Sequence, residues 1–293
     1  MAEAKGYTEI GSGDLQTYMN SHHEQDYLLI DVRQPVEYEQ RHIPGATLMP
    51  LPEFESRLFD LPADRDLIFY CKVGSRSQMA VMLAEEGEVT EKPIYHLKGG
   101  IHTFSGRTLA DFPKLRVFDS AGDFRDLLFT AMNMERGAER FYEQVRQRYG
   151  DQAIAKIFDQ LARVETAHAR ILYDVYKKSF EQAAPEPFDS QYENLSGDIM
   201  EGGQSVSEMI AKLEAIEGDV CTGLMELALN IEYSAYDLYR SAATRKDTDT
   251  ATAGLFMDIA QAEKSHMRMI AHALAECGKD RPDEEEQEVH ETL

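Results

Sequence analysis

The sequence predicts two domains: an α/β domain with a mainly parallel sheet over residues 1–112, then an all-α four-helix bundle over 123–279. Three observations predict this division. The 293 residues suffice for two cores. The first part alternates short β-rich runs with helical stretches, and the second contains four long segments with helical periodicity. A linker is expected at 113–122 and a solvated acidic tail at 280–293.

Turn residues divide the first part into four runs that are rich in β-forming residues. Strands are therefore expected at 27–32, 46–49, 67–71 and 94–97, and a helix at 75–86. In the second part, long helices are expected near 123–149, 151–182, 218–244 and 248–277. Prolines and glycines between the second and third long helices predict a crossover that contains a short helix, 205–216.

Composition and charge exclude several classes of function. Hydrophobic and charged fractions of 43% and 28% are ordinary for globular proteins, and no apolar run reaches the roughly 18 residues of a membrane helix. A net charge of -23 would repel nucleic acids and anionic membranes. The first residues lack the features of a secretory signal, so a cytoplasmic location is expected.

Three widely spaced cysteines, Cys71, Cys221 and Cys277, form no C-x-x-C pair. Neither a disulfide framework nor a cysteine-ligated iron site is therefore expected. Cys221 and Cys277 fall on or at the end of helices without basic neighbours, so we expect both to be inert. Cysteine chemistry is expected from Cys71 alone.

A repeat in the helical half is the most informative feature. The segment 131–142 matches 228–239, and 161–172 matches 259–270, which indicates a duplicated helical hairpin. In each copy, a glutamate on the first helix and a Glu-x-x-His pair on the second lie on apolar faces, so their side chains point toward the core. The six residues are Glu135, Glu165, His168, Glu232, Glu263 and His266.

Four buried carboxylates would repel one another and lose hydration unless positive charge neutralised them. Two divalent cations would do so, and a site with nitrogen and oxygen ligands suits iron or manganese. A single Glu-x-x-His is usually an exposed pair, but six such residues in register favour a metal site. Tyr142 and Tyr239 lie two turns after Glu135 and Glu232. They are expected either to donate hydrogen bonds to ligating carboxylates or to be plain core aromatics.

Through these motifs the helical half resembles the rubrerythrin family of the ferritin-like superfamily. The resemblance implies two iron ions, with manganese or a mixed pair as alternatives, and reduction of hydrogen peroxide in oxidative stress. It also implies an external electron donor, either rubredoxin-like or a flavoprotein. Two departures leave oxidase activity or iron handling open. The additional glutamate that the family carries one turn after the third-helix ligand is Ala235 here, and the cysteine-rich rubredoxin module is missing.

The run 67–77 predicts a strand that ends in a loop centred on Cys71 and opens a helix. Backbone N–H groups and the positive helix end would converge on the sulfur and Arg76 would add charge, so the thiolate is favoured. A buried, inert cysteine is the alternative. The residues expected to hold an anionic sulfur substrate are Lys72, Val73, Gly74, Ser75 and Ser77.

With the run 30–46 before it and 96–101 after it, this loop resembles the rhodanese family across residues 5–112. The resemblance implies that Cys71 takes sulfur from a sulfane-sulfur donor as a persulfide and passes it to a thiol acceptor or to cyanide. Related phosphatases use a loop one residue longer than that from Cys71 to Arg76, which favours sulfur transfer.

The main hypothesis is a bifunctional protein, a rhodanese-like sulfurtransferase joined to a rubrerythrin-like di-iron peroxidase. The alternative is a non-catalytic iron-binding or redox-sensing protein whose first domain docks partners or carries sulfur. Neither nucleic acid nor membrane is expected as a partner. A homodimer is expected, because many ferritin-like bundles associate through their helix faces.

Overall fold

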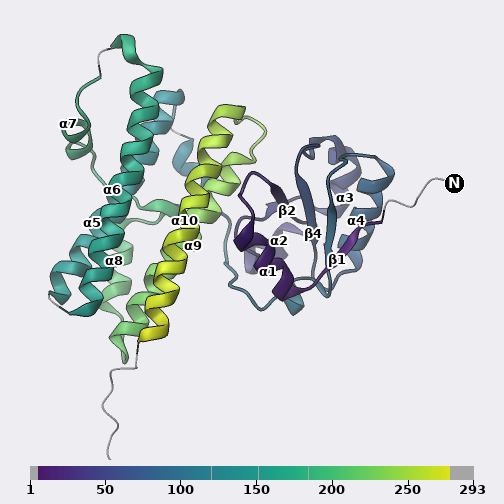
Figure 1. Cartoon of the computed structure of the whole chain (residues 1–293), viewed down its shortest axis with the longest axis horizontal. Helices are drawn as coiled ribbons and strands as arrows, with labels where there is room; N and C mark the ends of the chain where they lie inside the picture. Colours follow the sequence, from purple (N-terminus) through teal and green to yellow (C-terminus); the bar gives the residue numbers. More distant parts are fainter. Residues whose placement is uncertain (1–5, 120, 151, 184, 278–293) are drawn as a thin grey trace, which may run out of the picture.

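The computed structural model describes residues 6–277 except 120, 151 and 184. In the described part of the chain, an α/β domain and a helical bundle lie side by side (Figure 1). The expected acidic tail, 280–293, lies outside the described residues. None of the described helices combines the length and the apolar character that crossing a membrane requires.

The α/β domain is built on a five-stranded parallel sheet with the order β1-β5-β4-β2-β3. The strands are β1 (Thr8–Ile10), β2 (Tyr27–Asp31), β3 (Thr47–Leu48), β4 (Asp66–Tyr70) and β5 (Ile94–Leu97). All four expected strands are present, with ends that differ by at most one residue. Strand β1 is not predicted by the sequence pattern, because a three-residue edge strand with two exposed residues carries no periodicity.

Helices cover the two faces of this sheet, and each face has its own apolar cluster. The helices are α1 (Ser12–Ser21), α2 (Pro35–Gln40), α3 (Leu51–Phe54) and α4 (Ser75–Glu86). The central strands β2 and β4 are almost completely buried, as is typical of parallel strands that are covered on both sides. Their carboxyl ends, where β4 leads directly into Cys71, form the edge at which the thiol lies.

The bundle consists of two helical hairpins. The first pairs α5 (Phe124–Tyr149) with α6 (Ala153–Ser179), and the second pairs α9 (Val220–Ala243) with α10 (Thr250–Glu276). The side chains of Asp123, Asp219 and Asp249 accept hydrogen bonds from backbone N–H groups and so cap the N-termini of three of these helices. The crossover contains α7 (Phe188–Glu193), the 3-10 turn η5 (Glu201–Gly203) and α8 (Val206–Glu214). Of these, the sequence analysis expected only α8.

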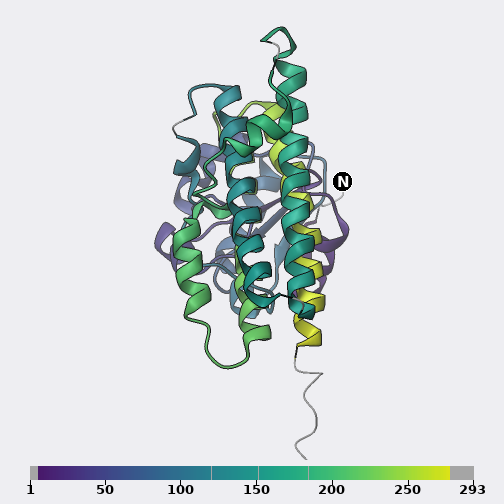
Figure 2. The same ribbon diagram turned by 90° about the vertical axis from the view of Figure 1, so that its left-hand side faces the viewer.

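Helices α9 and α10 lie between the first hairpin and the α/β domain (Figures 1 and 2). The fully buried Glu24 of the α/β domain forms ion pairs with Arg240 of α9 and Lys264 of α10. Nearby, Nε2 of His42 lies 3.0 Å from the buried Asp237 carboxylate. Breaking a buried charge pair typically costs about 3–5 kcal/mol. This charge cluster therefore fixes the bundle against the α/β domain.

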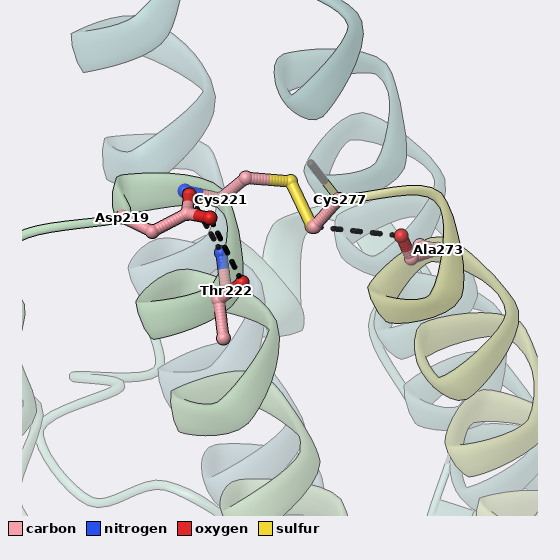
Figure 3. The surroundings of a disulfide bond; sticks show 5 residues. All are labelled: Asp219, Cys221, Thr222, Ala273 and Cys277. Carbon is pink, nitrogen blue, oxygen red and sulfur yellow. Dashed lines mark hydrogen bonds between the residues drawn. A yellow bond between two sulfur atoms is a disulfide. The ribbon is translucent and has the colours of Figure 1, made fainter. Parts of the chain in front are cut away.

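Cys221 and Cys277 form a disulfide, with their Cα atoms 5.6 Å apart (Figure 3). The expectation of no disulfide and of two inert cysteines is therefore wrong. The two residues are 56 positions apart in sequence, but the tight turn after α9 makes α10 run back along it. The start of α9 thus meets the end of α10, and a search for closely spaced cysteines misses such a pair.

Replacing Cys221 and Cys277 together by serine should lower the free energy of unfolding by about 2–4 kcal/mol, because the bridge restricts the unfolded chain. Denaturant unfolding followed by circular dichroism measures this loss. A reducing agent should destabilise the wild type and Cys71→Ser equally, and should leave the double-serine protein unchanged. Equal stability of the double variant and the unreduced wild type would contradict a structural role for the bridge.

Candidate metal centre and thiol site

The six predicted ligand side chains lie together in the interior of the bundle. The four glutamates have no exposed surface, and His168 and His266 are 7% and 3% exposed. Their ligand atoms form overlapping groups in which all atoms lie within 4.8 Å of one another. One half of the cluster comes from α9 and α10 and consists of Glu232, Glu263 and His266. The other half contains Glu135, Glu165, His168 and a residue that the sequence analysis did not select, Glu201.

Small side chains make room for the carboxylates. On α5, the buried residues Ala131 and Ala138 lie one turn before and one turn after Glu135, on the same helix face. The duplicated helix α9 repeats this arrangement, with Ala228 and Ala235 around Glu232. Larger apolar residues at these positions would fill the space that the carboxylates occupy. Both copies of the repeat therefore have the same small residues around the ligand-type glutamate.

Glu201 reaches the cluster from η5, in the crossover between the hairpins. It has no exposed surface, and neither of its carboxylate oxygens has a hydrogen-bond partner among the described residues. Helical periodicity could not identify it, because it lies on no long helix. The available signal was the Gly202-Gly203 pair that follows it, since both glycines adopt positive φ angles of 77° and 76°.

The cluster is costly without bound cations. Burial, reinforced by the negative charge of neighbouring carboxylates, raises the pKa of Glu165, Glu201 and Glu263 well above the usual range. Burial alone would lower the pKa of His266, but the charges of Glu232 and Glu165 outweigh it and raise this pKa to about 10. These shifts follow from carboxyl groups that share one buried space with the two imidazoles.

Several ligand-type atoms also lack hydrogen-bond partners, which is rare for buried polar groups. They include both carboxylate oxygens of Glu165 and Glu263 and Nδ1 of His168. That nitrogen lies 3.6 Å from carboxylate oxygens of Glu135 and Glu263, in a shared space rather than in direct hydrogen bonds. Oxygen and imidazole donors without sulfur are the set that iron and manganese accept. The residues therefore fit a pair of such cations.

Two tyrosines connect the hairpins through this cluster. The Tyr142 hydroxyl of α5 donates a hydrogen bond to Glu232 of α9, and the Tyr239 hydroxyl of α9 donates to Glu135 of α5 at 3.1 Å. Both tyrosines are fully buried. Of the two roles considered from the sequence, the contacts are those of hydrogen-bond donors to carboxylates of the cluster. Each donor restricts the orientation of the carboxylate on the opposite hairpin.

Cys71 follows β4 directly, and its thiol is held by hydrogen-bond donors from its own loop. The Gly74 N–H donates to Sγ at 3.1 Å, and the Ser77 hydroxyl donates at 3.5 Å. Burial tends to raise the pKa of the thiol, but these bonds and the N–H groups of Val73 and Ser77 outweigh burial and lower it. The loop therefore favours the thiolate.

Close backbone contacts fix the shape of this loop. A Cβ atom on Gly100 would lie 2.3 Å from the carbonyl oxygen of Cys71, so only glycine fits there. The Ile101 N–H donates to the same oxygen at 2.8 Å. On the other side, Nε2 of His96 lies 2.8 Å from the Gly74 carbonyl oxygen. The donors around the sulfur are thus held in place before any substrate arrives.

The remaining loop residues separate into two groups. Lys72, Val73 and Ser75 are exposed around the thiol, whereas Cys71 itself has no exposed surface. Arg76 instead donates two hydrogen bonds to Glu37, at 2.6 and 2.7 Å. Its charge was expected to stabilise the thiolate, but Glu37 neutralises much of it. The hydrogen bonds of the loop account for the lowered pKa of Cys71.

Comparison with known proteins separates the same two parts of the chain. Residues 14–107 match the rhodanese-like domain family, and residues 126–218 match the rubrerythrin family. The second match includes Glu135, Glu165, His168 and Glu201 but ends before α9. The assignment of the other ligand-type residues, on α9 and α10, therefore depends on the internal repeat and on their position in the structure.

Three proteins with known names are similar in sequence to the first domain. A sulfurtransferase of Allochromatium vinosum is 37% identical over 78 residues, which make up 26% of this chain and 70% of that protein. YqhL of Bacillus subtilis is 38% identical over 82 residues, 28% of this chain and 64% of YqhL. The probable adenylyltransferase/sulfurtransferase MoeZ of Mycobacterium tuberculosis is 39% identical over 100 residues, 33% of this chain but 24% of MoeZ.

Among solved structures, a rhodanese-like domain protein from Staphylococcus aureus matches with 21% identity and a TM-score of 0.31, covering 34% of this chain and 93% of that one. The family matches and the identity to the A. vinosum protein decide the classification. The chain belongs to the rhodanese-like family through its first domain and carries a rubrerythrin domain in its helical half.

Proposed function

We propose that the chain is bifunctional: its first domain transfers sulfane sulfur through Cys71, and its helical domain reduces hydrogen peroxide at a di-iron centre. The observation that carries the proposal is that each domain brings together the residues that a reactive site would need. One group is a thiolate-stabilising loop, and the other is a buried cluster of carboxylates and imidazoles, several of whose ligand-type atoms lack hydrogen-bond partners. The cytoplasmic location, the homodimer and the external electron donor stay predictions.

For sulfur transfer, the Cys71 thiolate attacks the terminal sulfur of a donor such as thiosulfate. The sulfur–sulfur bond of the donor breaks, sulfite leaves, and Cys71 becomes a persulfide. The N–H group of Gly74 and the hydroxyl of Ser77 donate hydrogen bonds to Sγ of Cys71 and would stabilise its thiolate before the attack and after the transfer. An acceptor thiolate or cyanide then takes the terminal sulfur, and the Cys71 thiolate is restored.

In the bundle, Glu135, Glu165 and His168 would hold one metal ion and Glu232, Glu263 and His266 the other. Two ferrous ions, when bound, would supply the two electrons that reduce hydrogen peroxide to water. The tyrosines Tyr142 and Tyr239 hold two of the carboxylates in orientation. The near-complete burial of all six residues excludes bulk water from the site.

The alternative function is non-catalytic iron binding or redox sensing, with a first domain that carries sulfur or docks partners. Ala235, where a rubrerythrin has a further glutamate, favours this alternative. The intact thiol loop counts against it. Steady-state turnover of peroxide with an added electron donor separates the two functions, because a sensor would be oxidised once and then stop.

Anaerobic loading with ferrous iron should give about two ions per chain, measured by elemental analysis after removal of free metal. His168→Ala and His266→Ala should each lower the content toward one ion, because each removes the only imidazole of its half of the cluster. Retention of less than one ion per chain by the wild type would contradict the metal site.

Ferrous-loaded protein mixed with a small excess of hydrogen peroxide should be oxidised in a rapid phase, followed by stopped-flow absorption. The same protein mixed with aerated buffer should react far more slowly. A single slow phase at the same rate in both mixtures would remove the peroxidase proposal and leave metal binding untouched.

Thiosulfate should add one sulfur atom to Cys71, detected by mass spectrometry, and Cys71→Ser should add none. Because the pKa of this thiol is lowered, the rate of its alkylation should reach half-maximum at a pH below that of an ordinary thiol. Ser77→Ala should move that midpoint upward, since it removes a donor to the thiolate. An unchanged midpoint in Ser77→Ala would assign the lowered pKa to the backbone donors alone.

A further inference from the structure

The crossover between the hairpins passes through the bundle in a narrow space. A Cβ atom on Gly137 of α5 would lie 2.2 Å from the carbonyl oxygen of Ile199. On the other side, a Cβ atom on Gly202 would lie 2.6 Å from the Cβ atom of Ser234 on α9. The backbone of 199–202 is therefore in direct contact with both helices that supply single glutamates to the cluster.

Hydrogen bonds fix this segment at both ends. The Asn133 side chain of α5 accepts the N–H of Gly197 at 2.9 Å. The Met200 N–H donates to the Gln204 carbonyl oxygen at 2.8 Å, and the Val206 N–H donates to that of Asp198 at 2.9 Å. These bonds close 198–206 into a compact loop with Glu201 inside it. Glu201 is therefore held in the interior by the backbone around it.

The Glu201 carboxyl group is buried in the cluster without a hydrogen-bond donor from its own loop. Both carboxylate oxygens are buried and lack hydrogen-bond partners among the described residues. One of them lies within 4.8 Å of ligand atoms of Glu135, Glu165 and His168. A carboxylate that only supported the loop would bond to the loop's own N–H groups. Neither oxygen of Glu201 does so, and one of them belongs to the group of ligand-type atoms in the cluster.

We infer that Glu201 is a fifth carboxylate ligand, which makes the two halves of the metal centre unequal. The half around Glu135 then has four ligand residues, and the half around Glu232 has three. The inference rests on the metal-binding part of the proposed function. It gives the crossover a function in metal binding, which neither the repeat nor the spacing of the helical ligands indicates.

The fifth carboxylate also changes the charge of the centre. With neutral imidazoles, five carboxylates leave one net negative charge around two divalent ions and one net positive charge around two trivalent ions. Without Glu201, the same states would be neutral and doubly positive. Glu201 should therefore strengthen the binding of the nearer ion and favour the oxidised state of the pair.

Cobalt(II) titration of the metal-free full-length protein, followed by visible absorption and calorimetry, tests the inference. The wild type should bind two ions in two steps of unequal affinity. Glu201→Gln should weaken the tighter step at least about tenfold and leave the weaker step unchanged. Glu201→Asp, which keeps the charge on a shorter side chain, should give an intermediate affinity.

The matched control is Glu139→Gln. Glu139 is also a carboxylate on the buried side of α5, but it accepts hydrogen bonds from Thr166 and Arg136 and belongs to no metal group. This variant should bind cobalt as the wild type does. In iron-loaded protein, Glu201→Gln should also raise the midpoint potential, measured by spectroelectrochemistry, whereas Glu139→Gln should not.

The outcomes separate the inference from the proposed function. A wild type that binds no cobalt and no iron refutes the metal site itself. If Glu201→Gln binds cobalt in two steps with wild-type affinities, the ligand role of Glu201 is refuted, whereas the metal site itself is not. Failure of metal-free Glu201→Gln to fold, or a large loss of its stability, would show a structural role instead and would equally overturn the inference.

Discussion

The carboxylates in the centre of the bundle impose the constraint on which the rest of the helical domain depends. Five of them lie out of contact with water, and several of their oxygens have no partner. The bundle does not supply a buried lysine or arginine to this cluster in the described residues; it supplies alanines that make room and tyrosines that orient. Bound cations would offset the cost of burying these carboxylates.

Helix α9 joins this centre to the α/β domain. Glu232 and Tyr239 on α9 face the cluster, whereas Asp237 and Arg240 on the same helix contact the α/β domain. On α10, the ligand-type residue Glu263 is adjacent to Lys264, which pairs with the buried Glu24. A rotation of either helix that moved a ligand would also disturb a buried ion pair. The position of the first domain therefore restrains the geometry of the metal cluster.

Sequence reasoning predicted what periodic patterns encode. The six ligand-type residues that lie together on the helices follow from helical spacing and duplication, and the thiol loop follows from the order of strand, loop and helix. Glu201 could not be found in this way, because a crossover has no period. The Glu24 cluster was missed because charged residues were assigned to solvated surfaces. The disulfide did leave a signal in the sequence. Cys221 and Cys277 are the same number of positions before and after Asp249 in the turn, and the same holds for Glu232 and His266. The two members of each pair therefore face each other across the hairpin.

The disulfide closes the α9–α10 hairpin into a covalent ring. The turn opposite the bridge exposes Lys246 and Asp247, so a protease such as trypsin has access to it. A cut there would leave two pieces that remain joined through Cys221 and Cys277 and that separate on a gel only after reduction. Because Glu232 lies on one piece and Glu263 and His266 lie on the other, the nicked ring would still hold together the three residues of this half of the cluster.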